Sequence, residues 1–467
     1  MTRVAMAAMA RSTFDLPCAE HNFNSARVLL QELGAELVGP DQLIMSADDI
    51  NGVVLPVADI YLLFMATFAD ASAAVALFAN VKGPILGWSM REPGQVGERL
   101  KLNSMCGVNL AAHALLNVGQ RLIHVHGNAD EPVVRTALSH ILAGKLPSTV
   151  ELPQVKNGVL ADEVATKAAL STLVGKVIGT VGDAPTGFTP CEYDADQLQD
   201  IFGLSVIPLS IDAAFNLVEQ VPVAEFEFSY AEAVAAQPSL SSVNVLEAKK
   251  VSRVEVAFSD WAKRSDLDAL ALRCWPEFPT QLGACICSSL GRIADSGIVS
   301  TCERDVLGAV TILVLEALGC DENYLVDIVE LQESDGIVRL WHCGSASTKL
   351  AADPVHATQT THCNRKLGVA GNFPLKTGPV TVFRIDRDLD PSNKKGLRMI
   401  LSSGESISAP NQFQGNTATV VTDAPAAALV NSIVTGGYPH HLVLSWRDVR
   451  PGIRRMAQLL DIPLVEW

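Results

Sequence analysis

The regular alternation of short apolar segments with helical segments limits the fold of this chain more than any other feature. RVAMAAMA is followed by the helix-like HNFNSARVLLQELG, and GVVLPVADIYLLF is followed by DASAAVALFANVKG. Alternation of this kind predicts a parallel sheet covered by helices on both faces. The pattern starts again at Lys176 with KVIGTVGDAP and CEYDADQLQDIFG, which predicts a second sheet of the same type.

The last part of the sequence has a different character. Helical periodicity is absent from Thr361 to Pro425, where runs such as PVTVFRIDR and LRMILSSGES alternate with Gly, Pro, Asn and Asp. This pattern predicts an antiparallel sheet or a small barrel. The final segments, VRPGIRRMAQLLD and IPLVEW, predict a closing helix and a closing strand.

These changes divide the 467 residues into three predicted domains, since the chain is too long for one ordinary core. We predict an N-terminal α/β domain over 1–165, a central α/β domain over 166–345 and a C-terminal β-rich domain over 346–467. The linker is expected between Leu146 and Val174. The predicted fold class is therefore α/β, with two Rossmann-like parallel-sheet domains followed by an antiparallel, barrel-like domain.

Composition excludes several classes of partner. The chain has 35 Lys and Arg against 51 Asp and Glu, a net charge of −16, which argues against nucleic acid and anionic membranes. No uncharged apolar run approaches the ~20 residues that cross a bilayer. The ten cysteines are scattered along the chain, and most lie within apolar segments. This distribution predicts reduced, buried thiols in a cytoplasmic protein. Cys285 and Cys287 lack the usual zinc spacing, and no second pair completes a zinc site.

Two acidic residues in apolar surroundings are the first candidates for chemistry. Glu303 follows a short predicted strand, and both it and Asp305 stand beside a predicted helix N-terminus. There a carboxylate either caps the helix or projects into the cleft at the strand ends of an open sheet. Asp327 lies inside the apolar strand YLVDIVEL, where a charge is costly unless it is paired or bound to a metal. We expect neighbouring strands to bring both carboxylates to one edge.

Three histidines stand at the ends of predicted strands. His342 ends the strand of RLWHCG, while His440 and His441 follow the turn GGYP and begin the strand-like HLVLSW. Neighbours on a strand point to opposite faces, so we expect one imidazole to point inward and the other away. Two carboxylates and one imidazole form a partial shell for a hard divalent cation, and such mixed donors favour manganese or magnesium. A structural histidine that satisfies a local hydrogen bond is the alternative reading.

Several segments resemble the L-fucose isomerase and L-arabinose isomerase superfamily, and most closely its fucose-isomerase-like proteins. They are, in order, ARSTFD, GPILGWSMREPGQVGERLKLNSMCG, CERDVLGAVT, LVDIVE, WHCG, PLKTGPVTVFRI and GGYPHHLVLSW. The resemblance implies a metal-dependent aldose–ketose isomerase that acts on a free sugar through an ene-diol. The sugar would be a deoxy-hexose, a pentose or a C6-modified hexose. The resemblance also implies a homo-oligomer, a trimer or a hexamer.

The resemblance further implies roles for individual residues. Glu303, Asp327 and His441 are expected to hold the metal, and the two acids are also expected to move protons. The expected cation is Mn²⁺, with Mg²⁺ or Co²⁺ as alternatives. His342 and His440 are expected in the substrate pocket. His342 resembles a histidine that serves as an additional metal ligand in arabinose isomerases.

Two further residues are candidate substrate contacts. Arg11, in ARSTFD, resembles a first-domain arginine that reaches the substrate in a neighbouring subunit's site, and a solvated surface charge is the alternative. Trp275, in RCWPEF, is a candidate for one wall of the sugar pocket, and a buried core tryptophan is the alternative.

Two other functions remain open from the sequence. One is a non-catalytic sugar-binding or regulatory protein of the same fold, which would need no metal. The other is a metal-dependent lyase or aldolase that uses the same shell. The sequence has no G-x-S-x-G elbow and no H-E-x-x-H helix, which argues against hydrolases.

Overall fold

The computed structural model describes residues 1–146, 152–155 and 157–467. Its N-terminal part is built on a parallel sheet with the strand order β2-β1-β4-β5-β6. Strand β3 also pairs with β1. The strands of this sheet are β1 (Thr2–Met9), β2 (Ala35–Val38), β3 (Leu43–Ile44), β4 (Ile60–Met65), β5 (Ile85–Ser89) and β6 (Leu122–His126). Its helices are α1 (Leu16–Glu32), α2 (Ser72–Phe78), α3 (Ser104–Leu116) and α4 (Pro132–Leu142). Every residue of β4 is buried, as expected for a strand covered on both faces.

A second parallel sheet has the order β10-β9-β7-β8. Its strands are β7 (Val177–Val181), β8 (Ser205–Leu209), β9 (Ala269–Leu272) and β10 (Val299–Thr301). The helices of this part are α5 (Glu163–Ser171), α6 (Ala195–Phe202), α7 (Ile211–Gln220), α8 (Val223–Ala236), α9 (Val245–Arg264), α10 (Cys287–Asp295) and α11 (Val306–Ala317). Both sheets and their helices agree with the fold class predicted from the alternating pattern.

The third sheet is mostly antiparallel and has the order β13-β14-β17-β12-β11-β18-β15-β16-β19. Its strands are β11 (Asn323–Gln332), β12 (Ile337–His342), β13 (Thr358–Thr360), β14 (Ala370–Pro374), β15 (Gly378–Arg387), β16 (Leu397–Ile407), β17 (Asn416–Thr422), β18 (His441–Ser445) and β19 (Leu464–Glu466). Its helices are α12 (Ala426–Thr435) and α13 (Arg450–Leu460). Because β16 also pairs with β17, the strands from β17 round to β16 close into a barrel, as predicted.

The sheet membership of β11 and β12 differs from the prediction. The apolar pattern predicts both strands in the central parallel sheet, whereas β11 pairs antiparallel with β18 and β12 with β17 in the barrel. A continuous apolar run predicts a strand buried on both faces, but it does not distinguish a parallel sheet from a covered barrel wall. The division at 165 and 345 stays a prediction.

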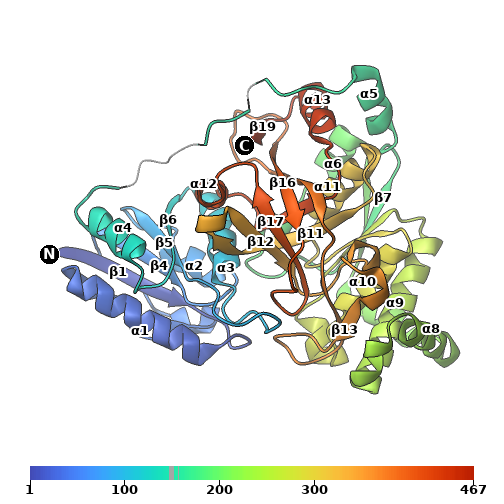
Figure 1. The fold of residues 1–467 in the computed structure, drawn as a ribbon, viewed down its shortest axis with the longest axis horizontal. Helices are drawn as coiled ribbons and strands as arrows, with labels where there is room; N and C mark the ends of the chain where they lie inside the picture. The colour runs from blue at the N-terminus through green and yellow to red at the C-terminus, as the bar shows by residue number, and fades with distance from the viewer. Residues whose placement is uncertain (147–151, 156) are drawn as a thin grey trace.

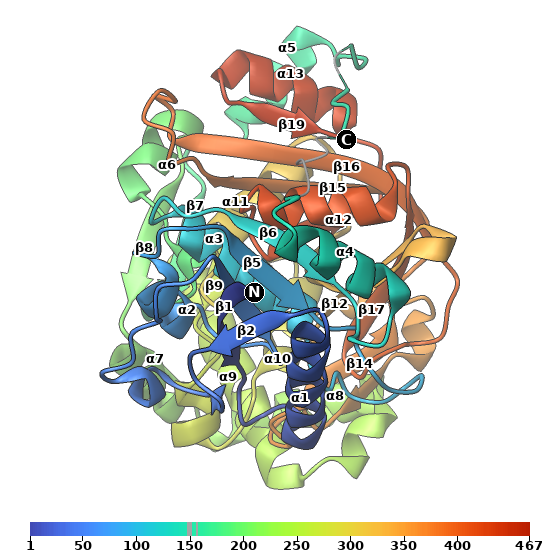
Figure 2. The ribbon, with the colours of Figure 1, turned by 90° about the vertical axis from the view of Figure 1, so that its left-hand side faces the viewer.

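The barrel lies between the two parallel-sheet parts (Figure 1). Figure 2 shows α12 between the long strands β15 and β16 and the N-terminal elements β6 and α4. Two helices that are buried on nearly all sides fill the junctions: α3 contacts β5 and β11, and α11 contacts β9, β10, β15 and β18. A helix without a polar face is stable only when it is buried all round, so both parallel sheets are packed against the barrel.

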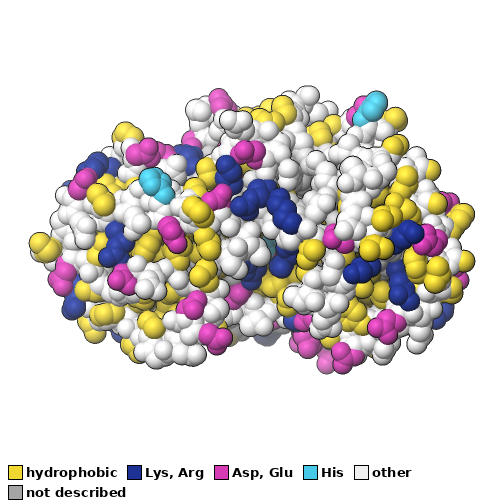
Figure 3. Space-filling view, turned by 90° about the horizontal axis from the view of Figure 1, so that it is seen from below, with side chains coloured by type: hydrophobic (Ala, Val, Ile, Leu, Met, Phe, Trp, Pro, Cys, Tyr) yellow, Lys and Arg dark blue, Asp and Glu magenta, His cyan; other side chains and the backbone are white. Residues whose placement is uncertain are grey.

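The surface shown in Figure 3 is hollowed near its middle, and Lys and Arg side chains lie around this hollow. Acidic, basic and apolar side chains are mixed over the rest of that face. In the part of the chain that the structure describes, no helix is both long and apolar enough to cross a membrane.

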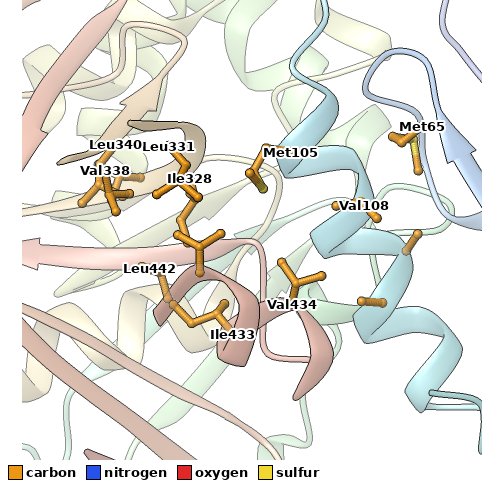
Figure 4. Packing of buried hydrophobic residues seen from close by; sticks show 14 of the residues in the cluster. Met65, Met105, Val108, Ile328, Leu331, Val338, Leu340, Ile433, Val434 and Leu442 are labelled. Atoms are coloured by element: carbon orange, nitrogen blue, oxygen red, sulfur yellow. The ribbon is translucent and has the colours of Figure 1, made fainter. Parts of the chain in front are cut away.

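One apolar core runs from the N-terminal sheet into the barrel (Figure 4). Met105 lies on the side of α3 that faces Leu331 and Ile328 of the barrel, and Val108 lies on the side nearer Met65. Burial of a side chain of this size stabilises the folded state by about 1.5–3 kcal/mol. The core therefore fixes the ends of the barrel strands, where the site described below lies, against the rest of the molecule.

Candidate active site

Glu303 lies in a tight turn between β10 and α11. Glu303 and Arg304 both have φ of +59°, a left-handed conformation that costs a non-glycine residue roughly 1–2 kcal/mol. Asp305 then caps α11, because its Oδ1 accepts a 2.8 Å hydrogen bond from the Gly308 N–H. The strained turn directs Glu303 away from the helix that follows, and strain of this kind is concentrated at functional sites.

Asp327 and His441 lie opposite each other on the neighbouring barrel strands β11 and β18. His441 Nε2 is 3.6 Å from Asp327 Oδ1 and 3.4 Å from Glu303 Oε2. The structure therefore brings together the three residues predicted to hold the metal. Glu303 and Asp327 do not come from neighbouring strands of one sheet, as the sequence analysis expected, because Asp327 belongs to the barrel.

His440 is also turned toward Glu303, with its Nε2 3.4 Å from Glu303 Oε2. The expectation that the two neighbouring histidines point in opposite directions is wrong. Their ring centroids are only 4.0 Å apart. Strand β18 begins at His441, so His440 belongs to the preceding turn and does not follow the alternation of the strand.

The donor atoms around His441 form two groups, each compact enough to hold a divalent cation. Glu303, His440 and His441 form one group whose ligand atoms lie within 4.8 Å of one another, and Asp327, His342 and His441 form a second. Among the described residues, His441 Nε2 and Asp327 Oδ1 are buried and have no hydrogen-bond partner. Buried acceptors that face one another without a donor are costly, and a cation between them removes that cost.

Asp305 and Arg384 hold the His441 ring in the orientation that such a cation needs. His441 Nδ1 lies 2.8 Å from Asp305 Oδ2, so the ring donates its Nδ1–H to the carboxylate and leaves the Nε2 lone pair free. A histidine that binds a metal is usually oriented by a carboxylate in this way. Arg384 in turn donates two hydrogen bonds of 2.7 and 2.8 Å to Asp305, and both side chains are fully buried.

The surroundings separate the pKa values of the two acids. Burial raises the pKa of Glu303, but the hydrogen bond from His440 and the nearby imidazoles outweigh it and lower the pKa to about 2. Burial dominates at Asp327 and raises its pKa to about 6. At Asp305 the burial effect is outweighed by Arg384 and His441, which hold its pKa well below the usual range.

The remaining predicted residues line one pocket with Glu303 and Asp327. They are Arg11, Trp275, His342 and His440. The Trp275 Nε1–H donates a 3.2 Å hydrogen bond to Glu303 Oε1, and the Arg11 guanidinium lies 4.6 Å from the Trp275 ring centroid. Arg11 therefore lies in the pocket of its own chain, and Trp275 forms a wall of the pocket.

Sequence reasoning missed three residues of this site. Asp305 received no specific role beside its predicted helix N-terminus, and nothing in the sequence distinguishes Arg384, because their partner His441 is distant in sequence. Arg365, in the segment before β14, also lines the pocket, with its guanidinium 5.4 Å from the Trp275 ring centroid. A lone arginine in a loop gives no signal of such a position.

No family model matches the sequence, but known enzymes match it over nearly its full length. A sulfoquinovose isomerase of Alkalicoccus urumqiensis is 30% identical over 465 residues, which cover 97% of this chain and 98% of that protein. A sulfoquinovose isomerase of Priestia aryabhattai is 28% identical over 470 residues, with 99% and 98% covered. One of a Clostridium species is 28% identical over 465 residues, with 98% of each chain covered. The similarity thus includes both parallel-sheet parts and the barrel.

Proposed function

The chain belongs to the sulfoquinovose isomerase family, and from this premise we propose that it converts sulfoquinovose into the corresponding ketose with the help of one divalent cation. We place it in the wider L-fucose isomerase superfamily on the order of its motifs. The cation would be Mn²⁺, with Mg²⁺ or Co²⁺ as alternatives, held by Glu303, Asp327 and His441. The proposal includes a homo-oligomer, a trimer or hexamer, in the cytoplasm.

One observation carries the metal-dependent part of the proposal. Acceptor atoms of two acids and one imidazole converge within a buried space, and two of these atoms have no hydrogen-bond partner in the described residues. A non-catalytic sugar-binding protein would have no use for such an arrangement, because unpaired buried acceptors destabilise the fold.

The reaction transfers a proton between C2 and C1 of the sugar while the carbonyl group moves in the opposite direction through an ene-diol. When bound, a divalent cation supplies a positive charge that stabilises the negative charge developing on the sugar oxygens. We assign the proton transfers to Glu303 and Asp327, one as base and the other as acid. General acid–base catalysis of this kind is worth about 10²–10⁴-fold in rate.

Other residues of the chain hold these groups in place. Trp275 and His440 bind the two carboxylate oxygens of Glu303 separately, which limits the carboxylate to one orientation. The ring of His342 lies 5.4 Å from that of His441 and forms part of the pocket wall. Catalytic groups held in this way need little rearrangement when the substrate binds.

The charges of the pocket support a substrate with an anionic substituent. Sulfoquinovose is a hexose that carries a sulfonate on C6. Arg11 pairs with Asp70 at 3.1 Å, whereas Arg365 makes no ion pair with any described residue. The Arg365 guanidinium is half-buried and lies 5.4 Å from the ring centroid of Trp275, whose Nε1–H contacts Glu303. A guanidinium without an acidic partner in this position is suited to bind a sulfonate by charge-assisted hydrogen bonds.

A substrate panel tests this proposal. With Mn²⁺ present, the enzyme is expected to form a ketose from sulfoquinovose faster than from uncharged aldoses. Arg365→Ala is expected to raise KM for sulfoquinovose about 10–150-fold, the equivalent of about 1.5–3 kcal/mol for a hydrogen bond to a charged group, and to leave KM for uncharged aldoses unchanged. Product mass and KM are the readouts.

The matched control is Arg121→Ala, which removes an exposed arginine that does not line the pocket and should leave both KM values unchanged. An equal rise in KM for charged and uncharged sugars in Arg365→Ala would contradict the assigned role. Products smaller than the substrate would indicate the alternative, a metal-dependent lyase or aldolase, and absence of any product would favour a binding protein.

A further inference from the structure

A group of cysteines forms the pocket wall beside the catalytic residues. The thiols that line the pocket are Cys274, Cys285, Cys287 and Cys343. The isomerisation uses none of them. Cys287 is the first residue of α10, and Cys343 directly follows β12, so these two thiols come from the central part and from the barrel.

Cys287 and Cys343 are positioned to react with each other. Their Sγ atoms are 3.4 Å apart, and no disulfide is formed. A disulfide has an S–S distance of about 2.05 Å, so the sulfur atoms need to approach by only about 1.4 Å. Cys343 is half-buried and faces the pocket, which gives a small oxidant that enters the pocket direct access to its sulfur.

Cys343 has one thiol and two imidazoles as close neighbours. His342 Nδ1 lies 3.2 Å from Cys343 Sγ, and His362 offers a ring nitrogen within 4.8 Å of both sulfur atoms. Cys287 contacts Cys343 directly and is therefore placed as the thiol that resolves the first oxidation product.

We propose that Cys343 and Cys287 form an oxidation site: hydrogen peroxide oxidises the two thiols to a disulfide, which stops turnover. The Cys343 sulfur attacks one peroxide oxygen, the O–O bond breaks, and the first water leaves with the thiol proton. The Cys287 sulfur then attacks the resulting sulfenic acid, the S–O bond breaks, and the second water leaves. In total the two thiols lose two protons and two electrons, and hydrogen peroxide becomes two waters.

The link is expected to displace a pocket residue. The Cys343 N–H donates a 2.9 Å hydrogen bond to His342 Nδ1, so a shift of Cys343 toward α10 moves His342 as well. His342 packs near His441, with ring centroids 5.4 Å apart. Oxidation therefore disturbs the catalytic geometry, and reduction of the bond restores it.

The experiment treats the purified full-length enzyme with hydrogen peroxide and maps its disulfides by mass spectrometry of a non-reduced digest. We expect a Cys287–Cys343 linked peptide to appear as activity falls at least tenfold, and dithiothreitol to reverse both changes. In Cys287→Ser the linked peptide is absent, Cys343 proceeds to the sulfinic acid, and dithiothreitol does not restore activity. Each variant is compared with its own untreated sample, and its melting temperature confirms folding.

Cys18→Ser is the matched control, because Cys18 is half-buried and lies outside the pocket; it should respond to peroxide as the unmodified enzyme does. Should Cys287→Ser fail to fold, Cys287→Ala serves in its place. In the unmodified enzyme, inactivation without the linked peptide would overturn the proposal. A link from Cys343 to Cys285 or Cys302, or a linked peptide with full activity, would overturn it as well. The linked peptide is detected by mass, so this result does not depend on the substrate proposed above.

Discussion

Glu303→Gln and Asp327→Asn are each expected to lower kcat by about 10²–10⁴-fold, the contribution of a positioned acid or base, with little loss of stability. Each substitution keeps the shape of the side chain and removes the carboxylate that we propose to exchange a proton with the sugar. Both acids are also predicted metal ligands, so the assays should use saturating Mn²⁺. The fold should persist because neither acid pairs with a buried arginine or lysine among the described residues.

The measurement is the initial rate of ketose formation, with thermal unfolding as the check of folding. Glu330→Gln provides a matched control on the same strand as Asp327. Glu330 pairs with Arg339 at 2.6 Å and does not line the pocket, so its loss should change kcat by less than about twofold. A near-normal rate in Glu303→Gln or Asp327→Asn would remove that residue from the proposed chemistry.

Asp305→Asn is expected to cause the largest loss of stability and also a loss of metal affinity. Asparagine caps a helix as well as aspartate does, so α11 should keep its cap. The substitution leaves the buried Arg384 without its carboxylate, and an uncompensated buried charge of this kind costs about 3–5 kcal/mol of unfolding free energy. Loss of the group that orients a metal-binding histidine costs about 10–100-fold in metal affinity.

A second variant separates the two effects of Asp305→Asn. Adding Arg384→Met removes the buried charge and should recover most of the unfolding free energy, because replacement of a whole buried ion pair by apolar groups is often nearly neutral. Metal affinity should stay low, since His441 still lacks its carboxylate. Denaturant unfolding and Mn²⁺ titration provide the two readouts. Unchanged metal affinity in both variants would show that Asp305 does not orient His441.

The sequence was sufficient to predict the fold class, because hydrophobic periodicity reports burial. Alternating apolar and amphipathic segments predicted both parallel sheets, and the loss of helical periodicity after Thr361 predicted the barrel. The assignment of β11 and β12 to the central sheet was wrong, since a strand covered on both faces has the same apolar pattern in either architecture. Only the pairing partners, which are distant in sequence, distinguish the two.

The site was predictable to the extent that its residues look unusual in isolation. Asp327 is a charge within an apolar strand, and the two adjacent histidines form a rare pair, so both attracted attention. Asp305, Arg384 and Arg365 look ordinary in sequence, because their importance depends on neighbours brought together by folding. The orientation of His440 was mispredicted because the exact start of β18 decides whether strand alternation applies, and the ends of strands are difficult to locate from sequence.

Whether Glu303, Asp327 and His441 bind one cation together can be measured by equilibrium binding of Mn²⁺, followed by electron paramagnetic resonance of the free ion. We expect one tightly bound Mn²⁺ per chain in the unmodified protein and a loss of affinity of at least 100-fold in His441→Ala. Absence of a tight site, or the same affinity in His441→Ala as in the unmodified protein, would contradict the convergence of Glu303, Asp327 and His441 on one cation.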